Sequence, residues 1–206
     1  MTAREYLDFI VQQIHSTVAA IVDRDGLPVT CVIDMMYSDD GGLYFLTAKG
    51  KSFYQRLKDE GFIALSGMKG EDTMSCTAVS VRGKVRELGS EMLSLLMRNN
   101  PYMFEIYPSE ESRRALTVFQ IYQGSGEWFD LSKKPIQRES FTFGGAQSKE
   151  RGYYITQDCI GCGRCLTQCP QDCIGITDQR AVIRQENCLH CGNCAEVCPA
   201  GAVIKR

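Results

Sequence analysis

Two cysteine runs in the last quarter of the chain have the residue types and the spacing to bind metal. Each run reads C-x2-C-x2-C-x3-C-P, and the second begins at Cys188, 29 positions after Cys159. This tight spacing wraps three thiolates around one iron–sulfur cubane and carries the fourth cysteine away at the start of a helix. The tandem runs therefore indicate two 4Fe-4S clusters. The cysteines in the two runs are Cys159, Cys162, Cys165, Cys169, Cys188, Cys191, Cys194 and Cys198.

Zinc is the alternative metal, because one Zn²⁺ ion also accepts four thiolates. Zinc sites rarely use triple C-x2-C-x2-C runs, and the proline after each fourth cysteine has no role in them. Nine of the 11 cysteines lie between positions 159 and 198, and the start of the chain lacks the apolar run of an export signal. We therefore expect metal thiolates in a reducing cytoplasm rather than a secreted disulfide framework.

The 29-residue repeat separates the remaining residues of these runs by role. It maps Cys173 onto Ala202, so Cys173 occupies a position where its counterpart is a small apolar side chain. We expect Cys173 to fill space, as free cysteines often do. The repeat also maps His190 onto Gly161, which indicates a loop histidine beside a cluster rather than a metal ligand.

Residues 153–206 resemble the bacterial two-cluster ferredoxins through these runs. In that family the fourth cysteine of each run binds the other cluster. The resemblance implies one cluster on Cys159, Cys162, Cys165 and Cys198 and another on Cys188, Cys191, Cys194 and Cys169. Acidic and basic residues are equally frequent from position 150 onward, which favours an internal electron path over a free shuttle that docks by charge.

The first 143 residues are expected to be mainly β-structure. Turn signals separate short β-rich runs, and such short connections can join only antiparallel strands. Six strands predict a closed or nearly closed barrel with a few flanking helices. The expected strands lie in 16–26, 28–37, 42–48, 62–68, 77–88 and 116–131, and the expected helices lie in 2–14, 52–58 and 90–101. Thr2 and Glu5 fit a capping box at the first helix.

One turn in this region has the residues of a phosphate site. In "TAKGKS", Gly50 allows a close approach, Lys51 supplies charge, and a helix is expected to begin at Ser52. Free N–H groups at a helix amino terminus suit a phosphate dianion. The alternative is a solvated turn in which Ser52 only caps the helix.

The stretch "PVTCVIDMMYSDDGGLYFLTAKGKSFYQRL", with the order of elements around it, is similar to the FMN-binding split barrel of the pyridoxamine 5'-phosphate oxidase-like superfamily. The resemblance implies a six-stranded antiparallel split barrel. It places FMN along one strand, with the phosphate at the following helix. The matching positions are Cys31, Val32, Ile33 and Asp34 on the strand, Thr47 at the next strand end, and Lys49, Lys51 and Ser52 at the helix start.

Three later residues match less specific positions of that superfamily. Thr77 falls near the flavin edge, and Trp128 and Arg138 fall in the region that lies against the flavin of a partner subunit. The alternatives are an ordinary strand threonine, a packed tryptophan and a surface arginine. The vitamin-oxidising members have arginine where this chain has Cys31, so the resemblance implies FMN binding without pyridoxamine phosphate oxidation.

The chain is therefore expected to join an FMN-binding barrel (1–143), a linker (144–152) and a two-cluster ferredoxin-like domain (153–206). Its expected function is that of an iron–sulfur flavoprotein oxidoreductase that passes electrons between FMN and the clusters. The alternative is an electron carrier whose barrel binds no flavin. Heme and deazaflavin are two other candidates for a cofactor in the barrel.

The resemblance to the split-barrel superfamily also implies a homodimer. A net charge of −2 and the lack of a long apolar run indicate neither nucleic acid nor membrane as a partner, and no set of residues identifies a catalytic group.

Overall fold

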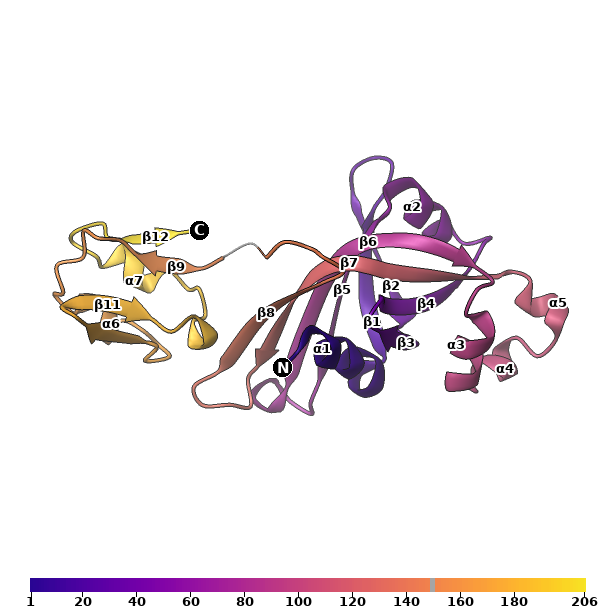
Figure 1. Ribbon diagram of the computed structural model, residues 1–206, viewed down its shortest axis with the longest axis horizontal. Helices are drawn as coiled ribbons and strands as arrows, with labels where there is room; N and C mark the ends of the chain where they lie inside the picture. Colours follow the sequence, from indigo (N-terminus) through magenta and orange to yellow (C-terminus); the bar gives the residue numbers. More distant parts are fainter. Residues whose placement is uncertain (149–150) are drawn as a thin grey trace. The chain divides into compact units, whose positions relative to one another are not determined.

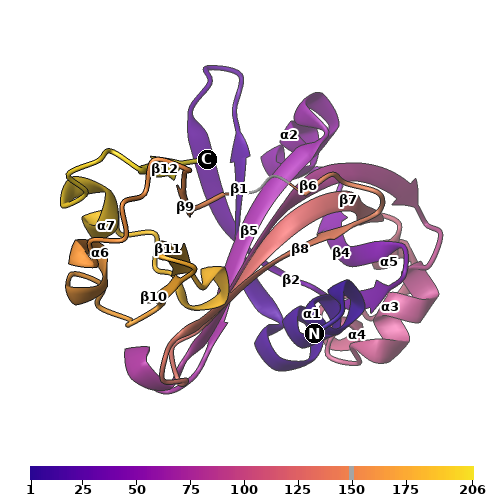
Figure 2. The same cartoon turned by 60° about the vertical axis from the view of Figure 1, so that its left-hand side comes forward.

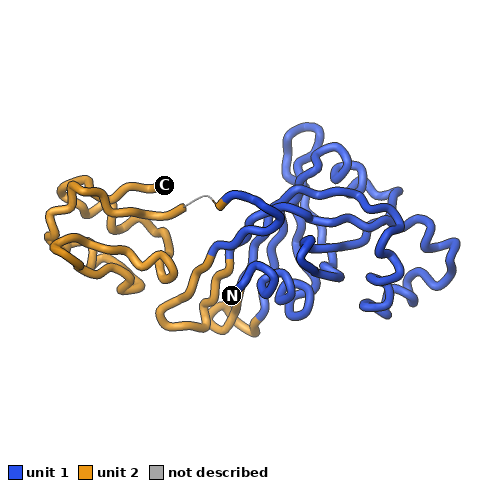
Figure 3. The backbone as a smooth tube through the Cα atoms, in the orientation of Figure 1, with its two compact units in different colours: residues 1–69, 78–127, 140–147 blue, residues 70–77, 128–139, 148–206 orange. Residues whose placement is uncertain are grey.

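The computed structural model describes residues 1–148 and 151–206 (Figure 1). Of the predicted linker, Lys149 and Glu150 lie outside the described residues. The chain divides into two compact units (Figure 3). The first contains 1–69, 78–127 and 140–147, and the second contains 70–77, 128–139 and 148–206. The tips of two strand pairs thus group with the cysteine-rich part of the chain.

An eight-stranded antiparallel sheet forms the barrel, in the order β2-β1-β5-β6-β7-β4-β3, with β8 also paired to β7. Its strands are β1 (Ser16–Val22), β2 (Pro28–Asp34), β3 (Tyr37–Asp39), β4 (Gly42–Ala48), β5 (Phe62–Lys69), β6 (Thr77–Gly89), β7 (Leu116–Asp130) and β8 (Gln137–Phe143). The six predicted strands are confirmed. The structure adds β3, which has only three residues, and β8, whose only buried side chains are Phe141 and Phe143.

Alternating side chains and a glycine turn determine how these strands pair. β1 buries Thr17, Ala19 and Ile21, whereas Val18 between them is exposed and Ala20 is half-buried, as expected for a strand with one face on the core. At the β3–β4 turn, Gly42 has φ +128°, and a Cβ atom there would collide with the carbonyl of Ile121 on β7. Only glycine fits this turn.

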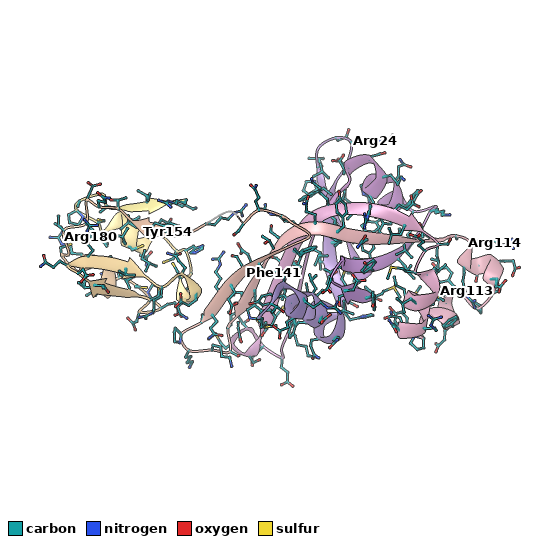
Figure 4. All side chains as sticks on the ribbon, in the orientation of Figure 1. Arg24, Arg113, Arg114, Phe141, Tyr154 and Arg180 are labelled. Carbon is teal, nitrogen blue, oxygen red and sulfur yellow. The ribbon has the colours of Figure 1, made fainter. Side chains whose placement is uncertain are left out.

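Short helices flank the barrel. They are α1 (Ala3–Phe9), the π-helix η1 (Ile10–Ile14), α2 (Ser52–Glu60), the 3₁₀ turn η2 (Thr73–Ser75), α3 (Leu93–Asn99), α4 (Met103–Ile106) and α5 (Glu110–Arg113). The predicted capping box of Thr2 and Glu5 is present. The Tyr6 ring of α1 stacks on Phe141 of β8, labelled in Figure 4, with ring centroids 4.5 Å apart. Helix α3 begins later than predicted because Met92 adopts a left-handed conformation, φ 59°.

Helix α2 is held against the barrel by two buried side chains of one face. Phe53 and Leu57 are 7 % and 1 % exposed, and the Phe53 ring lies 6.1 Å from that of Phe45 on β4. The helix ends at Gly61, which has a left-handed φ of 61° and donates its N–H to the Leu57 carbonyl. This packing fixes where the amino terminus of α2 lies relative to the end of β4.

The cysteine-rich part contains two small two-stranded sheets and two one-turn helices (Figure 2). Its elements are β9 (Tyr153–Ile155), α6 (Arg164–Thr167), β10 (Ile174–Thr177), β11 (Arg180–Ile183), the 3₁₀ turn η3 (Gln185–Asn187), α7 (Asn193–Glu196) and β12 (Val203–Lys205). β9 pairs with β12 and β10 with β11, all antiparallel. Within the described residues, no helix has the length and apolar character needed to cross a membrane.

Candidate metal and cofactor sites

Two cavities in the second unit collect the cysteines in crossed sets. One is lined by Cys159, Cys162 and Cys165 of the first run together with Cys198 of the second. The other is lined by Cys188, Cys191 and Cys194 of the second run together with Cys169 of the first. We call these the first and the second cluster cavity. Pro199 and Pro170, which follow the fourth cysteines, line the corresponding cavities.

Backbone N–H groups point at several of the sulfur atoms. Ala181 donates to Cys159 Sγ at 3.4 Å, His190 to Cys188 Sγ at 3.4 Å, and Ala202 to Cys198 Sγ at 3.3 Å. The N–H of Ala181 is the main cause of the lowered pKa of Cys159. Such bonds stabilise negative charge on sulfur and help to set cluster potentials.

Burial raises the pKa of other thiols in these runs. Desolvation, followed by the neighbouring thiols Cys188 and Cys191, raises the pKa of Cys194 to about 11. The thiol is therefore protonated at neutral pH until iron replaces the proton, so cluster assembly releases protons.

Cys173 lies in the second cluster cavity and is 1 % exposed. Its counterpart in the repeat, Ala202, is also buried. Both positions are thus packed, as the repeat predicts. The Cys173 thiol also contacts a predicted ligand, because its Sγ lies 3.3 Å from Cys169 Sγ. Burial is the main cause of its raised pKa, which keeps it a neutral thiol beside the ligand set.

His190 lies in the loop around the second cavity, as the repeat indicates. It has φ 56°, and Gly161 at the equivalent position has φ 66°. The loop therefore needs a left-handed residue at this point in both halves, and the backbone N–H of His190 contacts Cys188.

In the first unit, the predicted phosphate residues gather at the amino terminus of α2. Lys51 is the N-cap residue and makes no side-chain cap hydrogen bond, and Ser52 is the first helical residue. The reading of Ser52 as a helix cap is therefore wrong. Lys49 is exposed in the turn and donates its N–H to the Ala115 carbonyl. Thr47, at the end of β4, is 3 % exposed.

Two buried donors at this place have no partner. Among the described residues, three buried side-chain polar atoms lack a hydrogen bond, and two of them are Thr47 Oγ1 and Arg56 Nε. Arg56 lies four residues after Ser52, on the same side of α2. Buried donors without partners are rare in folded proteins and point to a ligand. The sequence reasoning missed Arg56, although its spacing from Ser52 was a usable signal.

Cys31 on β2 faces the same cations. Burial is the main cause of its raised pKa, and the charges of Arg56 and Lys51 oppose that rise. Its neighbour Val32 is 69 % exposed, and Ile33 is half-buried. Cys31 and Ile33 pair across β1 with buried residues, whereas Val32 pairs with exposed Val18. The predicted flavin strand β2 therefore has one face on the side of the buried β1 residues, with Cys31 and Ile33, and one face toward solvent, with Val32.

Asp34, at the end of β2, belongs to a separate polar cluster. Its carboxylate accepts hydrogen bonds from Ser16 at 2.6 Å and from Tyr102 at 2.7 Å, and Tyr102 Oη lies 3.0 Å from His15 Nε2. Burial acts to raise the pKa of Asp34, but these hydrogen bonds outweigh it and the pKa is lowered. Asp34 therefore has its oxygens engaged within the protein.

Thr77, Trp128 and Arg138 belong to the second compact unit, apart from the residues at α2. Trp128 is 8 % exposed, which agrees with packing, and Thr77 is half-buried at the start of β6. Their predicted contacts with flavin stay predictions.

Comparison with known families identifies the cysteine-rich part. A family model described as a 4Fe-4S dicluster domain matches residues 158–202. This part of the chain is therefore an iron–sulfur dicluster domain, which implies electron transfer. No curated protein matches the chain.

Solved structures resemble the barrel. A NimC/NimA family protein from Clostridium acetobutylicum has 16 % identity and TM-score 0.57, with 68 % of this chain and 90 % of that chain covered. A heme-binding protein from Mycobacterium smegmatis has 12 % identity and TM-score 0.54, with 69 % of this chain and 58 % of that chain covered. The third is a C. acetobutylicum protein of the pyridoxinephosphate oxidase family that is related to general stress protein 26 of B. subtilis. It has 14 % identity and TM-score 0.51, with 67 % of this chain and 94 % of that chain covered. These likenesses show that the first domain has the split-barrel fold.

Proposed function

We propose that this chain is an iron–sulfur flavoprotein in which the split barrel binds FMN and the ferredoxin-type domain binds two 4Fe-4S clusters. Electrons pass between the flavin and the clusters and then to a substrate or redox partner. The observation that carries the proposal is a pair of buried, unpartnered donors on the elements that flank the amino terminus of α2: Thr47 Oγ1 at the end of β4 and Arg56 Nε within α2.

A phosphate group fits this place because it supplies acceptors for every free donor there. Thr47 would donate its hydroxyl proton, Arg56 would donate Nε–H, and the uncapped N–H groups of the first turn of α2 would complete the set. The exposed Lys51 adds positive charge at the rim. A buried donor without a partner costs about 1–3 kcal/mol, and Thr47 and Arg56 each carry one. A ligand that accepts hydrogen bonds from both donors removes these costs, which makes its binding free energy more favourable.

The pairing of these cofactors follows from their electron counts. Bound FMN would exchange two electrons with a substrate, whereas each cubane carries one electron at a time. We infer that Cys159, Cys162, Cys165 and Cys198 hold one cluster and that Cys188, Cys191, Cys194 and Cys169 hold the other. The crossed lining of the two cavities supports this assignment.

The absorption spectrum of anaerobically purified protein tests the proposal. Flavin bands should appear above the broad cluster absorption, and FMN should stay in the supernatant after acid precipitation. A cluster absorption without any released flavin would favour the alternative, an electron carrier whose barrel has another role. Riboflavin or a deazaflavin in the supernatant would refute FMN in particular.

We further propose that the barrel pairs with a second copy of itself through an exposed face of β1, β2 and β5. These strands are neighbours in the sheet, and their exposed apolar side chains include Val18, Val22, Val32, Phe62 and Met68. Val18 lies directly opposite Val32 in the β1–β2 register. A contiguous apolar patch of this kind is typical of an interface, and a twofold axis would bring the same face from each copy together.

Val32→Asp is expected to weaken this dimer at least tenfold, because it would place a charge in the desolvated centre of the interface. Light scattering across a dilution series would measure the mass. Ile176→Asp is the matched control, since Ile176 is 44 % exposed on β10, and it should leave the mass unchanged. A Val32→Asp protein with the mass of the parent would rule out this face.

A further inference from the structure

The second cluster cavity contains one thiol more than its proposed ligand set. Five cysteines line it, whereas four cysteines line the first cavity, where Ala202 takes the equivalent place. The additional thiol belongs to Cys173, which directly precedes β10 and is 1 % exposed. A cubane takes four thiolates, so Cys173 binds no iron when the four proposed ligands are in place. Cys173 is therefore a free thiol inside a cluster site.

The sulfur atom of Cys173 contacts that of one proposed ligand. Cys173 Sγ lies 3.3 Å from Cys169 Sγ, within the range of a hydrogen bond between the two sulfur atoms. The sulfur atoms of a disulfide are about 2.0 Å apart. Once Cys169 no longer holds iron, the two atoms need to approach by only about 1.3 Å to form that bond.

A tight turn brings these two cysteines together. The Asp172 N–H donates to the Cys169 carbonyl at 3.3 Å, and Asp172 adopts a left-handed conformation with φ 47°. Arg184, directly after β11, holds the same turn from the other side. Its N–H donates to the Cys173 carbonyl at 2.8 Å, and its guanidinium donates to the Asp172 carbonyl. Protein groups, rather than iron, thus hold the backbone that presents Cys173 to Cys169.

The other half of the dicluster domain has the same turn without the additional thiol. Gly201, at the position equivalent to Asp172, has φ 60° and donates its N–H to the Cys198 carbonyl at 3.2 Å. Ala202 follows where the first half has Cys173. The chain therefore contains a matched site at which only one of the two sulfur atoms is present.

Oxidative loss of the second cluster would leave Cys169 open to irreversible damage. Cys191 of the same site is exposed, so a small oxidant reaches the cluster there. Peroxide oxidises a thiolate without iron to a sulfenic acid and then, in the absence of a second thiol, to sulfinic and sulfonic acids. A neighbouring thiol stops this sequence at a disulfide, which dithiols can reduce.

We propose that Cys173 is the resolving thiol of the second cluster site: after a peroxide has destroyed the cluster, Cys173 closes a disulfide with Cys169. Hydrogen peroxide first oxidises the Cys169 thiolate to the sulfenic acid and releases hydroxide. The Cys173 sulfur then attacks the Cys169 sulfur, the S–O bond breaks, and the hydroxyl group leaves as water. In sum, two thiols and one hydrogen peroxide give one disulfide and two waters.

The disulfide preserves the second site for reassembly, because reduction by a dithiol returns Cys169 to the ligand set. This inference rests on the proposed ligand set of the second cluster and not on FMN.

The test treats the full-length holoprotein with hydrogen peroxide and a chelator and then blocks free thiols with iodoacetamide. Trypsin cleaves after Arg164 and Arg180, so one peptide, 165–180, contains Cys165, Cys169 and Cys173. A disulfide within this peptide lowers its mass by two hydrogen atoms, and fragmentation shows which cysteine is alkylated. Cys173→Ala removes the resolving thiol, and Ala202→Cys places a thiol at the matched turn of the first site.

We expect most of the treated parent to contain a bond between Cys169 and Cys173, with Cys165 alkylated. In Cys173→Ala, Cys169 should instead carry sulfinic or sulfonic acid. Dithiothreitol, iron and sulfide are then added, and protection of Cys194 from iodoacetamide measures the rebuilt second cluster. The parent should recover at least about threefold more of it than Cys173→Ala does. Ala202→Cys should improve recovery of the first cluster in the same way.

A treated parent with an alkylated Cys173 and an oxidised Cys169 would overturn the proposal. A bond from Cys173 to Cys188, its other sulfur neighbour, would overturn it as well. Equal recovery of the second cluster in the parent and in Cys173→Ala would show that the disulfide does not preserve the site. Alkylation of Cys169 in the untreated, iron-loaded parent would refute its place in the ligand set. None of these measurements depends on flavin, so the proposed flavoprotein function is tested separately.

Discussion

Replacing Cys198 by alanine is expected to remove the cluster built by the first cysteine run rather than the cluster built by the run to which Cys198 belongs. Cys198 lines the cavity of Cys159, Cys162 and Cys165. Without its fourth thiolate a cubane loses one iron ligand and becomes labile to water and oxygen. Iron content should fall from about eight to about four atoms per chain, as expected for the loss of one of two 4Fe-4S clusters.

Alkylation of free thiols identifies which cluster is lost. In Cys198→Ala, Cys159, Cys162 and Cys165 should react with iodoacetamide under anaerobic conditions and be found by mass spectrometry. The thiols of Cys188, Cys191 and Cys194 should stay protected in the same sample. The reverse pattern would mean that each run holds its own cluster and that the crossed assignment is wrong.

Cys169→Ala should lose less iron than Cys198→Ala, although the two positions are equivalent in the repeat. The Cys173 thiol, 3.3 Å from Cys169 Sγ, lies where it can move to replace the missing ligand, whereas Ala202 offers no thiol to the other cluster. The double variant Cys169→Ala/Cys173→Ala should lose about four iron atoms. Cys173→Ala alone is the control and should keep the iron content of the parent, because the eight cysteines of the two runs are the proposed ligands.

Arg56→Met is expected to weaken FMN binding by about 10- to 100-fold, which corresponds to about 1.4–3 kcal/mol for a lost hydrogen bond to a charged group. Methionine is also a long unbranched side chain but lacks the Nε–H donor and the charge. Riboflavin lacks the phosphate, so its affinity should change less than about threefold. Fluorescence titration of the flavin-free protein would measure both dissociation constants.

The same substitution should stabilise the flavin-free protein, because it removes a buried donor that has no partner. We expect the free energy of unfolding without flavin to rise by about 1 kcal/mol, measured by urea denaturation. Opposite signs for stability and FMN affinity are typical of a binding residue and not of a structural one. Equal losses of FMN and riboflavin affinity would show that Arg56 does not contact phosphate.

A charge-matched control separates a direct contact from general electrostatics. Arg24, labelled in Figure 4, has a side chain that is 79 % exposed and pairs with Asp59 near the end of α2. Arg24→Ala removes one positive charge beside the same helix, and exposed ion pairs contribute little. FMN affinity in Arg24→Ala should stay within about twofold of the parent.

Local sequence patterns predicted the elements that depend on near neighbours. The capping box of Thr2 and Glu5, the helix that begins at Ser52 and the six main strands all follow from side-chain periodicity and turn residues within a few positions. The cysteine spacing likewise predicted the dicluster domain, because three cysteines of each run lie within seven consecutive residues.

Features that depend on long-range packing could not be predicted in this way. Strand β8 contains only two buried side chains, so its sequence pattern resembles that of a polar loop. The segment is recognisable as a strand only from its pairing with β7. Arg56 looks like an ordinary helix-surface arginine until α2 is placed so that Arg56 faces Cys31. The main chain of Ile136 is hydrogen-bonded to the side chains of Gln171 and Asn187, which lie 35 and 51 positions further along the chain, and backbone contacts of this kind have no sequence signature.

The pairing of β9 with β12 brings the two ends of the dicluster domain together. Gly152 and Arg206 exchange main-chain hydrogen bonds at 3.0 and 3.2 Å, so the polypeptide enters and leaves the domain at neighbouring points. A domain with adjacent entry and exit can be inserted into a surface loop or attached to the end of another protein without stretching its own fold. A gene segment encoding such a domain can thus add a two-cluster electron relay to an existing flavin-binding fold in one recombination event.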